Sequence, residues 1–162
     1  MPHLQLDEFA ARFRDAMAAV CTPVAVITAM DGERPHGTTV SAFSSLSMSP
    51  PSVLVSLDRG SDLLALALES RTFGMNVLGR EQSILAAQFA RKGKDKFQDV
   101  LWSVDHTVPR IADVPHWIAA EVMETVEIAD HTVVFGRVVA VQSEAIPPLT
   151  YHSRGFGTHA AI

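Results

Sequence analysis

The sequence predicts a mainly β protein, an antiparallel barrel with helices on the outside. Roughly six or seven segments rich in β-branched residues alternate with turn residues, and most of them follow one another as hairpins. Helical periodicity is confined to one segment at the start and two in the middle. The chain has 162 residues, 48% hydrophobic and 19% charged, so residues 1–162 fit one globular domain. No Gly-rich nucleotide loop is present, which disfavours a doubly wound parallel sheet.

The first third of the chain predicts a helix followed by a hairpin. Asp7 is a plausible N-cap for a helix that ends near Val20. An apolar stripe recurs along this helix at Phe9, Phe13, Ala16, Met17 and Val20. After Thr22-Pro23, the β-branched segment 24–30 predicts a buried strand, and Asp31-Gly32 predicts a tight turn into an antiparallel partner.

The segment 37–51, GTTVSAFSSLSMSPP, is polar although apolar segments flank it. Its first half alternates as a strand, with Thr39 and Ser41 on one face and Val40 and Ala42 on the other. Its second half, residues 44–47, is expected to be a loop. Small hydroxyls and free backbone amides suit a planar, polar ligand that carries phosphate. A serine-rich turn without a ligand fits these residues equally well.

The middle of the chain predicts strand, helix, strand and helix. Residues 52–58 and 72–78 are apolar strands, and Ser61 is a natural N-cap for a helix to Glu69. Arg59 and Ser61 at this helix start suit a phosphate, although an ordinary capped helix explains them too. Asn76 inside its strand needs a partner, either backbone or ligand.

The next helix, residues 81–91, is expected to turn Ile84, Leu85 and Phe89 inward. The cluster 91–96, RKGKDK, follows it and is the basic cluster of an acidic chain. A solvated loop is one interpretation of this cluster, and a landing place for an anionic cofactor is the other.

The last third predicts an irregular segment, residues 100–115, and then two long strands, residues 117–127 and 131–142. Ala129-Asp130 forms the turn between them. Gly136 in mid-strand indicates a bulge or a close approach of backbones. The Pro-Pro segment at 147–148 returns the chain to the sheet edge, and the tail from Ser153 is expected to be mobile.

Several function classes are disfavoured by the residues present. A net charge of −5 argues against a nucleic-acid surface, and the single cysteine, Cys21, rules out an internal disulfide. The seven histidines lack metal-ligand spacings, and no nucleophile motif surrounds a serine. We see neither a signal peptide nor an apolar run near the ~20 residues that span a bilayer, so we expect a cytoplasmic protein.

Five segments in order resemble the short-chain flavin reductases, whose domain is the FMN-binding split barrel. They are FRDAMAAV with VAVITA, GTTVSAFSSLSMSPPSVLVSL, FGMNVL with QFARKGKDKF, ADHTVVFGRVVAV and PPLTYHSRGF. The resemblance covers about residues 8–156. It implies an antiparallel split β-barrel and an NAD(P)H:flavin oxidoreductase. In such an enzyme a hydride passes from NADH or NADPH to FMN or FAD, and the reduced flavin supplies a separate monooxygenase.

The resemblance also implies which residues bind the cofactors. His131 would face the nicotinamide as the catalytic candidate, with Tyr151 beside it and Arg154 reaching a phosphate. The cofactor-binding set is Thr39, Val40, Ser41, Ala42, Ser44, Ser45, Ser47, Ser56, Leu57, Asp58, Arg59, Ser61, Asn76, Lys96, Phe97, Tyr151 and Arg154. Ala129 departs from the family, which usually has Gly before Asp-His.

Family members typically form homodimers, so a homodimer is expected here. Two other functions remain open. One is a flavoprotein of the same fold that keeps FMN tightly bound and acts on another small molecule. The other is a flavin- or haem-binding module without enzymatic activity. The residues do not separate FMN from FAD, or NADH from NADPH.

Overall fold

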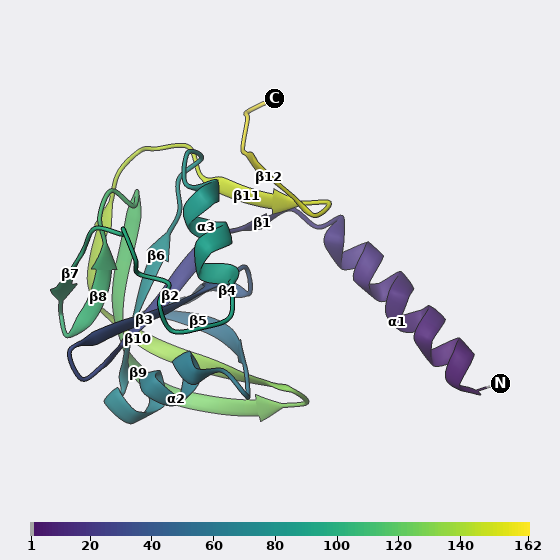
Figure 1. Cartoon of the computed structure of the whole chain (residues 1–162), viewed down its shortest axis with the longest axis horizontal. Helices are drawn as coiled ribbons and strands as arrows, with labels where there is room; N and C mark the ends of the chain where they lie inside the picture. The colour runs from purple at the N-terminus through teal and green to yellow at the C-terminus, as the bar shows by residue number, and fades with distance from the viewer. Residues whose placement is uncertain (1) are drawn as a thin grey trace.

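The computed structural model describes residues 2–162, with side chains from residue 6 onward. The helices are α1 (Pro2–Ala18), α2 (Asp62–Ser70) and α3 (Ser83–Ala90). The strands are β1 (Thr22–Pro23), β2 (Ala25–Asp31), β3 (Arg34–Val40), β4 (Phe43–Met48), β5 (Pro51–Asp58), β6 (Thr72–Val77), β7 (Trp102–Asp105), β8 (Val108–Ile111), β9 (His116–Ile128), β10 (His131–Ser143), β11 (Leu149–His152) and β12 (Gly155–Thr158). Seven strands form one sheet in the order β3-β2-β6-β9-β10-β5-β4, in which all neighbours are antiparallel (Figure 1). The prediction of a mainly β, antiparallel fold is confirmed.

The main sheet curls until its two edge strands meet. β3 and β4 lie at opposite edges of the sheet, yet only Ser41 and Ala42 separate them in the sequence. The Ser56 N–H donates to the Ala42 carbonyl at 2.9 Å, which carries the β4–β5 pairing up to this link. Edges that meet at one end without pairing along their length are the arrangement of a split barrel. The expected loop at 44–47 is wrong, because these residues pair with β5 as an edge strand.

Helices α2 and α3 cover two separate apolar clusters of the sheet. Ser61 caps α2 as predicted, its hydroxyl accepting the Leu64 N–H at 3.4 Å, and α2 packs beside Phe73. Helix α3 buries Ala86 and Phe89 in the second cluster. Ile84, predicted to point inward, is 81% exposed, because α3 presents its small residues to the sheet.

A hairpin occupies the segment predicted to be irregular. Strands β7 and β8 pair antiparallel, with Val104 opposite Pro109. A proline is tolerated here because this sheet has only two strands. Each is an edge strand, and the backbone groups on its outer side have no neighbouring strand to bond. The prediction failed because the prolines and short strands masked the alternation.

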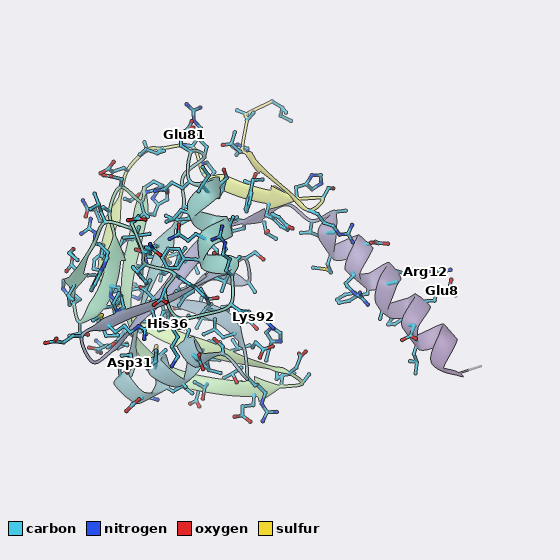
Figure 2. The ribbon with its side chains drawn as sticks, in the orientation of Figure 1. Glu8, Arg12, Asp31, His36, Glu81 and Lys92 are labelled. Carbon is cyan, nitrogen blue, oxygen red and sulfur yellow. The ribbon has the colours of Figure 1, made fainter. Side chains whose placement is uncertain are left out.

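Helix α1 extends away from the rest of the molecule (Figure 1). It begins at Pro2, so Asp7 lies inside the helix and the predicted N-cap is wrong. Proline is favoured in a first turn, where its missing N–H would have no partner anyway. The predicted stripe is exposed, with Phe9 at 71% and Phe13 at 61%. Figure 2 shows Glu8 and Arg12 together on this helix, and an ion pair joins them.

The long hairpin β9–β10 has the predicted turn and bulge. Its register shifts between Phe135 and Gly136, and a Cβ on Gly136 would lie 2.6 Å from the Phe73 ring. The predicted bulge is therefore confirmed, and the atoms that approach Gly136 closely belong to the Phe73 and Ala120 side chains. The tail is more ordered than expected, since residues 155–158 pair with β11 as β12. Within residues 2–162, no helix is both long and apolar enough to cross a membrane.

Candidate functional site

A cavity of about 540 Å³ lies between β3, α3 and the β11–β12 hairpin. It brings together five of the predicted residues, which are Thr39, Val40, Ser41, Tyr151 and Arg154. Its other lining residues are Val24, Ala86, Ala87, Ala90, Arg91 and Phe156. The cavity thus combines an apolar wall, hydroxyl groups, two aromatic rings and two guanidinium groups.

The apolar wall is flat because α3 presents alanines and lies close to β3. The Thr39 hydroxyl donates to the Ala86 carbonyl at 2.6 Å and ties the end of β3 to the helix. A Cβ on Gly37 would come within 2.9 Å of the Phe89 ring, so only glycine permits this separation. Opposite the helix, the Tyr151 and Phe156 rings lie 5.4 Å apart and tilted by 60°.

The β11–β12 turn places Arg154 at this cavity. Ser153 and Arg154 form the two-residue turn between His152 and Gly155, with φ of 50° and 62°. Left-handed backbone at two consecutive residues other than glycine is uncommon and costs free energy. A hydrogen bond to the end of α1 stabilises this turn, since the Ser153 N–H donates to the Ala18 carbonyl at 2.6 Å.

A second group of predicted residues gathers at the end of β5, outside that cavity. The Asp58 carboxylate accepts the Gly60 N–H at 2.7 Å, and Asp58 lies opposite His131 in the β5–β10 ladder. Arg59 reaches Glu127 at 3.3 Å and the Ala129 carbonyl at 3.3 Å. The structure therefore groups His131 with Asp58 and Arg59, and not with Tyr151.

His131 is oriented by its neighbour in the sequence. Its Nδ1 lies 2.8 Å from a carboxylate oxygen of Asp130, and the hydrogen bond from His131 holds the pKa of Asp130 below its usual value. An ionised carboxylate only accepts hydrogen bonds, so Nδ1 carries the proton and Nε2 is free for another contact.

The serines of β4 remain available at the sheet edge. Ser44 and Ser45 are exposed and Ser47 is partly buried. The Ser44 hydroxyl donates to the Ser45 carbonyl at 2.9 Å, and the Ser47 hydroxyl accepts the Ser49 N–H at 3.1 Å. They follow the Ser41–Ala42 link, and Ser56 lies beside it on β5.

Two predicted cofactor residues, Asn76 and Leu57, face the interior, and a third, Phe97, is half-buried against it. Asn76 is 0% exposed, donates to the Val26 carbonyl and Thr28 hydroxyl, and accepts the Ile111 N–H. Leu57 is 3% exposed in the core. The Phe97 ring packs edge-on against Phe89, 4.8 Å between centroids. Packing and internal hydrogen bonds therefore engage all three side chains.

Lys96 of the basic loop lies close to His36 of β3. The Lys96 ammonium donates to the Gly37 carbonyl at 3.1 Å, and burial lowers its pKa. Burial first, and then Lys96, lower the pKa of His36. The basic loop that carries Lys92 (Figure 2) lines a hollow of about 410 Å³ that shares Arg91 with the larger cavity.

Sequence reasoning included Arg91 only within the basic cluster 91–96, and it missed Phe156 and the alanines of α3 as lining residues. The signal was present, because small residues at 86, 87 and 90 lie on one helical face. It was overlooked because alanine carries no chemistry of its own.

The family model for the flavin reductase like domain matches residues 17–160. The chain belongs to this family. It is 34% identical over 147 residues to the reductase component of 4-nitrophenol 4-monooxygenase/4-nitrocatechol 2-monooxygenase of Rhodococcus opacus, covering 91% of this chain and 80% of that protein. It is 34% identical over 143 residues to the NADH-dependent flavin reductase StyB of Pseudomonas fluorescens, covering 86% of this chain and 84% of that protein.

The fold is also that of solved relatives. The styrene monooxygenase flavin reductase of Pseudomonas putida S12 superposes with a TM-score of 0.85 at 32% identity, covering 93% of this chain and 98% of that one. The resemblance inferred from the five sequence segments is confirmed.

Proposed function

We propose that this protein is a flavin reductase that passes a hydride from NADH to FMN or FAD and supplies the reduced flavin to a separate monooxygenase. The observation that carries this proposal is the cavity beside α3. Hydroxyls, a flat alanine wall, two aromatic rings and two guanidinium groups converge there in a chain whose named relatives are reductase components. NADPH is the other possible donor.

The lining residues fit a flavin. The alanine wall and the Tyr151 ring suit a planar ring system, the Thr39–Ser41 backbone offers hydrogen-bond partners along its edge, and Arg154 suits a phosphate. A bound flavin supplies the hydride acceptor, so the protein needs no nucleophile. Its own task is to hold two rings in contact, exclude water and place dipoles where charge develops.

His131 is proposed to orient the nicotinamide through its free Nε2, while Asp130 fixes the ring. Arg59 and Ser61 at the start of α2 form a second candidate for phosphate, and a ligand there would compete with Glu127 for Arg59. Ser56 lies beside the Ser41–Ala42 link, between the cavity and Asp58, and the β4 serines continue from the link along β5 in the direction away from Asp58.

The test is NADH oxidation at several concentrations of added FMN and FAD. We expect saturable turnover that depends on free flavin. Comparing turnover with FMN and with FAD then identifies which flavin the protein uses. Protein that binds flavin but oxidises neither NADH nor NADPH would contradict the proposal. His131→Ala is expected to slow turnover and to retain flavin binding. If this variant folds but no longer binds flavin, a purely orienting role for His131 is refuted.

A homodimer and a cytoplasmic location belong to the same proposal. The exposed apolar stripe of α1 supports the dimer, because exposed apolar patches of this kind mark interaction sites. The printed names of the relatives support a monooxygenase as the recipient of reduced flavin.

A further inference from the structure

Arg154 faces two anion sites at once. Arg154 lines the 540 Å³ cavity, and its guanidinium donates to the carboxylate of Asp15 in α1 at 2.7 Å. Asp15 lies outside every residue group that the reductase proposal uses. We propose that Asp15 sets the affinity of the cavity for phosphorylated ligands, because it competes with the ligand phosphate for Arg154. This inference rests on the proposed function, which assigns Arg154 to a phosphate.

The backbone keeps both partners in place. Arg154 sits in a tight turn whose two residues have left-handed backbone, so its Cα position is fixed. The same turn is bonded to the end of α1 through Ser153 and Ala18. Asp15 lies one helical turn before Ala18, and its carboxylate is therefore held near Arg154 whether or not a ligand is present.

The charges of the cavity favour an exchange of partners. Arg91 and Arg154 are the two cations that line it, and Asp15 offsets the charge of Arg154. The ion pair is exposed, 63% for Arg154 and 70% for Asp15, and exposed pairs of single charges are weak. A phosphate group can bind a guanidinium through two oxygens and brings more charge, so it can displace the carboxylate.

The phosphate has two possible sources, the flavin nucleotide (FMN or FAD) and the pyrophosphate of the nicotinamide nucleotide. The experiment therefore titrates wild-type protein and variants with FMN, with riboflavin, which lacks the phosphate, and with ADP. Flavin binding is followed by fluorescence quenching and ADP binding by calorimetry. Turnover is not needed for any of these measurements.

We expect Asp15→Asn to tighten binding of FMN or of ADP by about 2- to 5-fold, the range that an exposed ion pair supports. Riboflavin binding should not change. Asp7→Asn is the matched control, because it removes the same charge from the same exposed helix without contact to Arg154. Arg154→Gln should weaken binding of the phosphorylated ligand. In the double variant, Asp15→Asn should cause no further change in that affinity.

Equal affinities of Asp15→Asn and wild type for both FMN and ADP would overturn the proposal. So would equal tightening by Asp7→Asn, which would indicate a general charge effect, or tightening of riboflavin. Flavin-dependent NADH oxidation by wild type is measured separately, so a failure of Asp15 to act as a competitor is distinguishable from a failure of the reductase proposal.

Discussion

Asn76 joins three parts of the molecule from within β6. Its side-chain amide bonds the Val26 carbonyl, the Thr28 hydroxyl and the Ile111 N–H, so it fastens the β7–β8 hairpin to the main sheet. Asn76→Ala leaves buried groups unpaired and is expected to lower the free energy of unfolding by about 2–4 kcal/mol. Urea denaturation measures this loss. Ser103→Ala, exposed on the same hairpin, is the control, and equal stability of both variants would contradict a structural role for Asn76.

Two hairpin turns begin with a residue in left-handed backbone, alanine in one and glycine in the other. Ala129 adopts φ of 53°, and Gly32 adopts φ of 59° with no atom within 4 Å of the position that a Cβ would take. Left-handed backbone is strained for alanine and free for glycine, so Ala129→Gly should raise stability by about 0.5–1 kcal/mol and Gly32→Ala should lower it by about 1 kcal/mol. Thermal unfolding of the two variants checks the opposite signs. A destabilised Ala129→Gly would show that the turn carries no such strain.

At the scale of elements, the sequence predicted what local patterns determine. The hairpin β2–β3, the capped helix α2 and the bulge at Gly136 follow from turn residues, capping and glycine. The hairpin β7–β8 did not, since its strands are short and a proline interrupts their alternation. The cavity was only half predicted, because the hydroxyls of β3 carry a chemical signal and the alanines of α3 do not.

The packing of the basic loop against β3 makes stability depend on pH. Burial and then Lys96 lower the pKa of His36, while Asp62 and Asp31 oppose this and Arg34 adds to it. The folded protein then binds the proton less readily than the unfolded chain, so stability is complete above the unfolded pKa of about 6.5 and falls as the pH drops below it.

His36→Gln should therefore reduce the loss of stability between about pH 7 and pH 5, a range chosen around the ordinary histidine pKa. The urea midpoint measured across this range tests the prediction. His159→Gln, in the exposed terminal segment, is the control. An unchanged pH profile in His36→Gln would exclude His36 as the cause.

At the scale of the whole molecule, α1 leaves an apolar stripe uncovered. Its members on the helix are Leu6, Phe9, Phe13 and Met17, and exposed Val20 follows just beyond the helix end. We expect a dimer by light scattering, and Phe9→Ser with Phe13→Ser should shift it to monomer. The monomer should keep its β spectrum, since neither side chain packs in the core. A monomeric wild type would contradict the dimer.

The strand order of the main sheet has a consequence for how the chain folds. Hairpins such as β2–β3 and β9–β10 form from neighbours in the sequence, whereas β5 must find β10 across the whole of residues 59–130 before the sheet is continuous. Pairing over such separations is slow, because loop-closure entropy is lost before contacts compensate for it. The cavity likewise combines residues 24–41, 86–91 and 151–156, so it depends on contacts between segments far apart in the sequence, and newly made chains pass through a stage without it.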